Sequence, residues 1–190
     1  MDSYFKPDDS FCEVLDIGCA TGNYCVHLKK IMPDTKYYGC DPSEAMINKA
    51  RELHPRGLFS VDSLPSLSFP DQHFDLTVCR GGVMMLPPLK QSIKEIVRVT
   101  RKTALIEFVV APKTLETIYR GAAGGSSRVT IYSFHDIARA YSEVVKPLPE
   151  NPTHASTLDP VLGGLPEVKE ELTIVVVRWN RPIGMQNTKQ

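Results

Sequence analysis

The stretch VLDIGCATGN, residues 14–23, decides the fold, because an apolar run ends in a small-residue turn and a helical pattern follows at once. Its first half suits a strand that is buried on both faces. Gly18, Ala20 and Gly22 leave room where the backbone turns sharply and a ligand approaches closely. A helix that begins near Asn23 would direct its unpaired N–H groups and the positive end of its dipole into this gap. The stretch therefore predicts a ligand site at the carboxyl end of the first strand.

The spacing of the glycines differs from that of a dinucleotide-binding fingerprint, which is G-x-G-x-x-G. Here the glycines stand as G-x-x-x-G, with Ala20 at the middle position. We expect Ala20 to need no positive φ, so that the alanine does not count against ligand binding. A tight strand-to-helix turn without a ligand is the structural alternative for this stretch taken alone.

Length and composition indicate one globular domain. The chain has 190 residues, 42% of them hydrophobic, and its formal net charge is +0. This balance indicates neither nucleic acid nor an anionic membrane as a partner, and no apolar run approaches the length of a bilayer span. We therefore expect a soluble cytoplasmic protein with a domain at residues 12–180, a flexible lead at 1–11 and a flexible tail at 181–190.

The cysteines predict reduced, mostly buried thiols rather than a disulfide scaffold, because their number is odd and no C-x-x-C pair occurs. They are Cys12, Cys19, Cys25, Cys40 and Cys79. The histidines are scattered without the spacing of zinc ligands, so we expect no metal site.

Strands and helices alternate along the chain, which is typical of a doubly wound α/β sheet with right-handed crossovers. Strands are expected at 14–17, 37–40, 58–61, 74–79, 104–110 and 172–179, and helices at 24–32, 44–53, 89–100 and 133–144. Ser43 and Ser133 are placed to cap two of the helices, the latter with Asp136 at the third position. The small-residue segment 121–127 reads as a mobile loop.

Taken together, the motifs resemble those of the class I S-adenosylmethionine-dependent methyltransferases of the small-molecule type. The matching segments are 14–22, 38–46, Asp62 with Ser63, and 74–78, in the family's order. The resemblance implies a three-layer α/β/α fold with a mostly parallel, seven-stranded sheet. Its last strand, 172–179, would be antiparallel, and its sixth strand would lie near 144–148.

The resemblance also implies S-adenosyl-L-methionine as the cofactor and assigns residues to it. The cofactor-binding residues would be Asp16, Gly18, Cys19, Ala20, Gly22, Asp41, Pro42, Met46, Asp62, Ser63, Cys79 and Arg80.

Each polar part of the cofactor has an implied partner. Asp41, the acid after the second strand, would accept hydrogen bonds from the ribose diol. Asp62 would accept from the adenine amino group, with the Ser63 N–H on a ring nitrogen and Met46 over the adenine face.

The methionine end has its own implied residues. The Gly18 carbonyl, Cys79 and Arg80 would hold the ammonium and carboxylate. Asp16 would act through water or by fixing the loop.

One departure from the family concerns the substrate side, because only eleven residues precede Cys12, whereas related enzymes carry helices there that roof the cleft. The site would then be open, or roofed by a second copy or a partner subunit, or impaired. No residue stands out as the catalytic base; His135 is the weak candidate.

Three functions stay open at this point. The first is a methyltransferase that acts on a small molecule. The second is a catalytically impaired cofactor-binding subunit that needs a partner chain. The third, a nicotinamide-dependent oxidoreductase, is disfavoured by the glycine spacing and by the antiparallel last strand.

Overall fold

The computed structural model describes residues 10–80, 88–120, 125–145, 154–158 and 172–181. The strands in these ranges are β1 (Glu13–Ile17), β2 (Lys36–Asp41), β3 (Leu58–Val61), β4 (Phe74–Cys79), β5 (Thr100–Ala111), β6 (Leu115–Arg120), β7 (Ser126–Ser133), β8 (His154–Leu158) and β9 (Leu172–Asn180). The helices are α1 (Asn23–Ile31), α2 (Glu44–Leu53), α3 (Leu89–Val99) and α4 (Phe134–Val144). None of these helices combines the length and hydropathy that a bilayer crossing requires.

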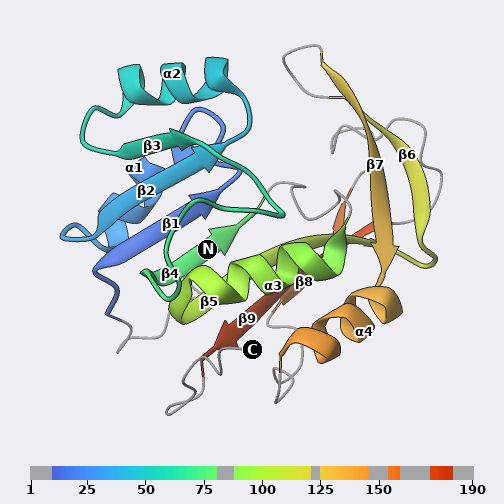
Figure 1. Ribbon diagram of the computed structural model, residues 1–190. Coiled ribbons are helices and arrows are strands. Elements are labelled where there is room, and N and C mark those ends of the chain that lie inside the picture. The colour runs from blue at the N-terminus through green and yellow to red at the C-terminus, as the bar shows by residue number, and fades with distance from the viewer. Residues whose placement is uncertain (1–9, 81–87, 121–124, 146–153, 159–171, 182–190) are drawn as a thin grey trace.

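Strand β1 lies at the centre of the parallel half of the sheet, between β2 and β4. The order along the sheet is β3-β2-β1-β4-β5-β7-β6, and the strands from β3 to β5 in this order are parallel to one another. Strand β4 is buried along its whole length, as a strand covered on both faces must be. The predicted doubly wound, mostly parallel α/β fold is confirmed (Figure 1).

Two apolar clusters make the sheet the middle of three layers. One face packs against α3 and α4, which supply Ile93, Ile96, Ile137 and Tyr141. The other face packs against α1 and α2, which supply Cys25, Leu28, Ile47 and Ala50. Because α1 is the next element after β1, this packing sets the position of the bend that joins them.

The last strand was predicted correctly, and the sixth was not. Strand β9 pairs antiparallel with β5 from Thr103 to Val110. The predicted sixth strand near 144–148 is wrong where the structure describes it, because Val144 ends α4 and Val145 caps that helix. Strand β8 instead pairs antiparallel with β9 and therefore runs parallel to β5.

A hairpin of β6 and β7 extends the sheet beyond the predicted seven strands. Its two strands pair antiparallel from Leu115–Ile131 to Arg120–Ser126, and β7 joins β5 at Val110 and Ala111. The predicted loop at 121–127 is therefore wrong at Ser126 and Ser127, which belong to β7; residues 121–124 lie outside the described ranges. Val129 and Ile131 of the hairpin form a small apolar cluster with Ala111 of β5 and Leu172 of β9.

The chain is anchored slightly beyond both predicted domain boundaries. Phe11 is buried, and its carbonyl accepts a hydrogen bond from Thr35 Oγ1 at 2.8 Å. Arg181 is held at the other end: its guanidinium donates to the carbonyls of Val97 (2.6 Å) and Thr100 (2.8 Å). The rest of the predicted lead, 1–9, and of the predicted tail, 182–190, lies outside the described residues.

The thiols follow the prediction. Four of the five cysteines are buried, and Cys12 is exposed. All five are free thiols.

A buried carboxylate ties together the amino ends of β1, β4 and β5. Asp75 accepts from the Cys12 N–H at 2.8 Å and from Arg101 Nε at 2.9 Å, with Lys102 Nζ at 3.2 Å. Burial raises the pKa of Asp75, but these donors outweigh it and set the pKa at about 2. This end of the sheet, opposite to the predicted ligand site, is thus closed by ion pairs.

Candidate functional site

Three alternate residues of the bend after β1 have positive φ. Gly18 has φ 74°, Ala20 φ 48° and Gly22 φ 77°. The expectation that Ala20 needs no positive φ is therefore wrong. The left-handed region brings Cβ close to the following carbonyl and costs an L-residue other than glycine about 1–2 kcal/mol. Hydrogen bonds hold the backbone in this conformation: the Cys19 N–H donates to the Cys40 carbonyl, and the Ala20 N–H donates to the Asp41 carboxylate.

The bend is tied to β2 by main-chain hydrogen bonds. The N–H groups of Gly18 and Cys19 both donate to the Cys40 carbonyl, at 2.8 and 3.0 Å. A Cβ on Gly39 would lie 2.8 Å from Cys19 Sγ, so the close contact of bend and strand depends on that glycine. Helix α1 then begins with Gly22 as N-cap, and no side chain caps it. Its first turn therefore presents N–H groups toward the bend.

Asp41, at the end of β2, joins the two loops that follow β1 and β2. Its Oδ2 accepts from the Ala20 N–H at 3.0 Å, and its Oδ1 accepts from the Ser43 N–H at 2.9 Å. A carboxylate has about four acceptor positions, two on each oxygen. Within the described chain, one position on each Asp41 oxygen therefore remains. Two adjacent acceptors are what a pair of neighbouring hydroxyl groups needs.

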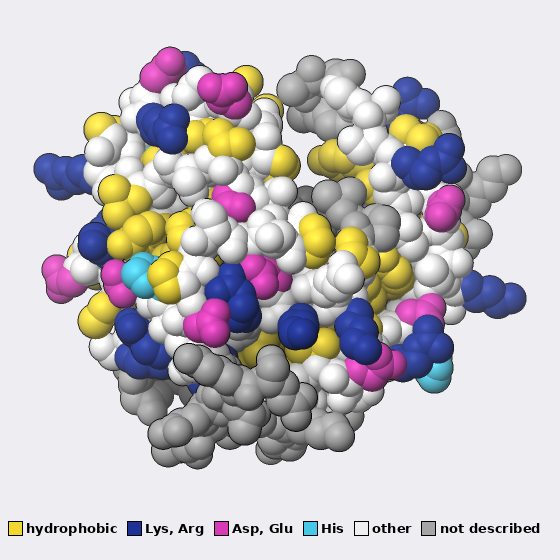
Figure 2. Space-filling view, viewed as in Figure 1, with side chains coloured by type: hydrophobic (Ala, Val, Ile, Leu, Met, Phe, Trp, Pro, Cys, Tyr) yellow, Lys and Arg dark blue, Asp and Glu magenta, His cyan; other side chains and the backbone are white. Residues whose placement is uncertain are grey.

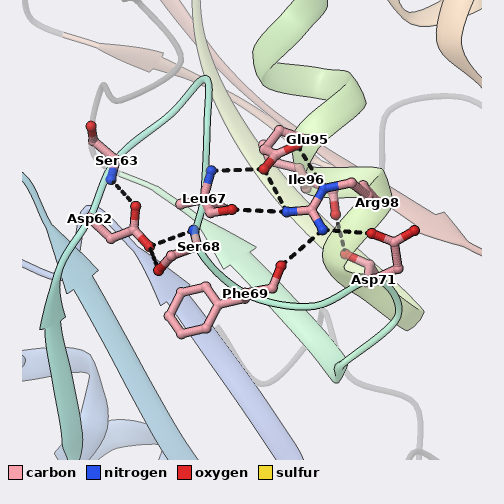
Figure 3. Close-up of polar contacts among 10 residues, drawn as sticks. Asp62, Ser63, Leu67, Ser68, Phe69, Asp71, Glu95, Ile96 and Arg98 are labelled. Atoms are coloured by element: carbon pink, nitrogen blue, oxygen red, sulfur yellow. Dashed lines mark hydrogen bonds and ion pairs between the residues drawn. The ribbon is translucent and has the colours of Figure 1, made fainter.

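Asp62, which follows β3, lies beside Asp41, since its N–H donates to the Asp41 carbonyl at 3.2 Å. Its Oδ2 accepts from both the N–H (2.9 Å) and the hydroxyl (2.6 Å) of Ser68, and its Oδ1 accepts from the Ser63 N–H at 2.9 Å (Figure 3). By the same count, the described contacts leave one acceptor position on Oδ1. The side chain is thus ready for a single N–H donor, whereas the Ser63 N–H would have to leave Asp62 in order to reach a ligand.

Asp16 lies buried beneath the bend. Its Oδ2 accepts from the Tyr37 hydroxyl at 2.6 Å. Burial raises the pKa of Asp16 to about 7, although Tyr37 and the Arg80 charge lower it. A carboxyl group with this pKa is poised to become charged when a cation arrives.

Arg80, directly after β4, completes this end of the site. Its guanidinium lies 4.8 Å from the centre of the Tyr24 ring, and its Nε lies 3.5 Å from Glu107 Oε2. Strand pairing explains the position, because Cys79 is in register with Ile17 on one side and with Ile106 on the other. The Cys79 thiol itself is buried, and burial raises its pKa.

The geometry accommodates the group that the motifs imply. Asp41 and Asp62, whose carboxylates have spare acceptor positions, follow the neighbouring strands β2 and β3, and the uncapped helix α1 begins just after Ala20, which donates to Asp41. The carboxyl group of Asp16 lies in β1, and the guanidinium of Arg80 follows β4. A diol, an amino group and an amino-acid zwitterion, the polar parts of S-adenosylmethionine, match these groups in that order.

Residues 14–103 match the family model described as a methyltransferase domain. This segment is a methyltransferase domain. The match covers β1 to the first part of β5, and hence every residue of the predicted cofactor set. Over residues 14–103, this match agrees with the methyltransferase family that the motifs indicated.

Two curated relatives illustrate the range of the match. The trans-aconitate 2-methyltransferase of Variovorax paradoxus is 32% identical over 83 residues, which are 44% of this chain and 32% of the relative. A malonyl-[acyl-carrier protein] O-methyltransferase of Halorhodospira halophila is 27% identical over 159 residues, which are 80% of this chain and 50% of the relative. The chain spans no more than half the length of the curated relatives it matches.

A solved structure extends the likeness of the fold beyond the family match. The crystal structure of YcgJ from Bacillus subtilis superimposes with a TM-score of 0.66 at 16% identity, over 91% of this chain and 93% of that one. The β5, β8 and β9 region outside the matched segment thus belongs to the same fold.

The remaining predicted residues are Pro42, Met46 and His135. Pro42 is exposed next to Asp41, and Met46 is half-buried in the first turn of α2, where its N–H donates to Ser43 Oγ at 3.4 Å. His135 is exposed at the second position of α4, a helix that packs against α3 and β7 rather than beside β1 and β2 (Figure 1). Its role as a base stays a prediction.

The residues that position the predicted cofactor-binding side chains were not predicted from the sequence. Tyr37 orients Asp16, Glu107 pairs with Arg80, and Ser68 holds Asp62. Tyr37 and Glu107 stand inside strands, where a polar group among apolar neighbours was the available signal. Ser68 lies in a loop, and its contact with Asp62 gives no sequence pattern.

Proposed function

We propose that this chain binds S-adenosyl-L-methionine and transfers its methyl group to a small-molecule acceptor. The observation that carries the proposal is the position of Asp41, which accepts from the bend at Ala20 and keeps two acceptor positions for a diol. The bound sulfonium would supply an activated methyl group for an in-line displacement. The protein's task is then to hold the methyl donor and to align the acceptor.

The described residues account for the first part of that task. Asp41 binds the ribose, and Asp62 accepts from the adenine amino group. Asp16, whose pKa is about 7, becomes charged beside the cofactor's ammonium, and Arg80 faces its carboxylate. Charge-assisted bonds of this kind are about twice as strong as neutral ones.

For the acceptor we propose a small carboxylic acid or its thioester. Arg80 lies at the strand end next to the methyl donor, where a guanidinium can bind a second carboxylate. Relatives named for trans-aconitate and for malonyl-carrier methylation support this class. A second copy or a partner subunit over the strand ends would help to exclude water there. The free thiols of all five cysteines support a reducing, cytoplasmic location.

Calorimetric titration with S-adenosylhomocysteine tests the cofactor. We expect micromolar binding of S-adenosylhomocysteine and none of NAD. Asp41→Ala should weaken binding by about tenfold or more, since the diol loses a charged acceptor, whereas Asp34→Ala, at an exposed turn after α1, should leave it unchanged. Unchanged affinity of Asp41→Ala would refute the site.

Transfer from labelled cofactor tests the acceptor. A panel of small di- and tricarboxylic acids, alcohols and amines is incubated with the chain alone and with candidate partner subunits. Label in the acids supports the proposed class. Label only when a partner is present supports the partner-dependent reading, and label in amines alone contradicts the carboxylate proposal.

A further inference from the structure

The loop between β3 and β4 carries a clamp that the methyl-transfer chemistry does not itself require. Arg98 and Glu95, on α3, form a bidentate ion pair with Nη2–Oε1 at 2.6 Å and Nε–Oε2 at 2.9 Å. Both side chains reach from the helix to the main chain of this loop (Figure 3). A paired Arg and Glu that both bond to the main chain of a loop fix the course of that loop.

The clamp holds the peptide groups on both sides of Ser68. Leu67 donates its N–H to Glu95 Oε1 at 2.7 Å, and its carbonyl accepts from Arg98 Nη2 at 3.0 Å. On the other side, the Phe69 carbonyl accepts from Arg98 Nη1 at 2.9 Å. Ser68 is therefore placed by α3 rather than by its own side chain.

Ser68 passes this placement on to Asp62. Its N–H and hydroxyl both donate to Oδ2 of the Asp62 carboxylate, which fixes the rotation of that carboxylate. The rotation in turn sets the direction of Oδ1, which accepts from the Ser63 N–H and keeps one acceptor position. Without Ser68 the carboxylate could turn about its last side-chain bond, which has a broad torsional profile. The direction of the remaining acceptor thus depends on α3.

The clamp is partly shielded from water. Side-chain exposure is 14% for Glu95 and 28% for Arg98. Burial raises the pKa of Glu95, but the Arg98 and Leu67 bonds outweigh it and the pKa is lowered. The loop has a second, apolar anchor, because Leu67 is buried and the Phe69 ring packs edge-on against Phe74 at 5.0 Å. Loss of the clamp should therefore loosen the loop without detaching it.

We propose that Arg98 and Glu95 are positioning residues for base recognition: through Ser68 they aim Asp62 at the exocyclic amino group of the nucleoside. The proposal rests on the proposed function and deepens it, because it assigns the selectivity for adenine to a pair of residues on α3. Neither residue touches the ligand. The expected consequence is a change in which base is preferred, rather than a uniform loss of affinity.

The test compares two probes, S-adenosylhomocysteine and S-inosylhomocysteine, which lacks the amino donor. Wild type should prefer the adenosyl compound by about tenfold or more, the value of one hydrogen bond to a charged group. Asp62→Ala should abolish the preference. Arg98→Met should reduce the preference to within about threefold. The double variant Asp62→Ala/Arg98→Met should show the same preference as Asp62→Ala alone, since both changes act on one bond.

One further variant is a matched control, and another is a second test of the proposal. Arg101→Met removes another guanidinium from a buried carboxylate, Asp75, at the far end of the sheet, and should lower stability while the base preference stays. Ser68→Ala removes one donor to Asp62 at an exposed position, and should lower the preference while stability stays. Ser68→Ala also decides the question if Arg98→Met does not fold.

The outcomes separate the two claims. If wild type binds neither probe, the proposed function fails and the positioning role falls with it. If wild type prefers the adenosyl compound and both Arg98→Met and Ser68→Ala keep the full preference, only the positioning role is refuted. Equal binding of both probes by wild type also refutes it.

Discussion

Replacement of Ala20 by glycine should stabilise this protein, although it lies in the bend of the proposed cofactor site. Ala20 has φ 48°, which costs about 1–2 kcal/mol for an L-residue. Glycine removes that cost but gives the unfolded chain more freedom, worth about 0.4–1 kcal/mol. Ala20 is exposed, and the N–H that donates to Asp41 is kept in the variant. The difference between these two ranges is about 0–1.6 kcal/mol, so the expected gain is about 0.8 kcal/mol, or about 2–3 °C in Tm for a chain of this size.

Urea unfolding of wild type and Ala20→Gly measures this gain, and the same chemical change in a helix gives the control. Ala138 lies inside α4, so Ala138→Gly should destabilise by about 1 kcal/mol. Opposite signs for the two changes would support the left-handed conformation of Ala20. If Ala20→Gly is no more stable than wild type, the bend does not have the backbone described above.

Three further predictions concern groups that the fold buries. Asp75 has a pKa of about 2, below its ordinary 3.8, so its stabilisation of roughly 2 kcal/mol is present above about pH 4 and lost as the pH falls toward 2; acid unfolding of Asp75→Asn should lack that part of the slope, and an unchanged slope would contradict it. The pH dependence that Asp16 contributes has the opposite sign: its pKa is raised to about 7, so the free energy of unfolding should decline as the pH rises from about 4 to about 7. Urea titrations of Asp16→Asn across this range should not show the decline. Arg181→Ala should cost about 1–3 kcal/mol in urea unfolding because the carbonyls of Val97 and Thr100 lose their donor; a loss below about 0.5 kcal/mol would mean that the contact is not formed in solution.

The central strands could be predicted from sequence because their side chains carry the information locally. Strands β1 and β4 are apolar runs that end in turns, and Ser43 and Ser133 cap the helices that they were expected to cap. The convergence of Asp41 with the bend followed from topology, since neighbouring parallel strands end at one edge of a sheet.

The hairpin of β6 and β7 was missed because its middle is rich in glycine and serine, which dominated the interpretation of 121–127 as a loop. The alternation of Val129 and Ile131, both buried, with polar neighbours was the signal of a strand. Strand β8 was missed for a different reason. It is set by its pairing with β9, the next strand along the chain, and local propensity does not report such a pairing.

The backbone of Ala20 could not be predicted from residue type, because alanine rarely adopts positive φ and only its neighbours impose it. The distribution of charge on the surface, in contrast, agrees with the composition of the sequence. Basic and acidic side chains are interspersed on the face seen in Figure 2, as the zero net charge indicated.

The most direct test is a crystal structure of this chain soaked with S-adenosylhomocysteine. We predict that both ribose hydroxyls lie within about 2.5–3.0 Å of the Asp41 carboxylate oxygens, with the adenine amino group on Asp62 Oδ1. A ligand bound away from the bend at Gly18–Gly22, or with its ribose turned from Asp41, would contradict the account.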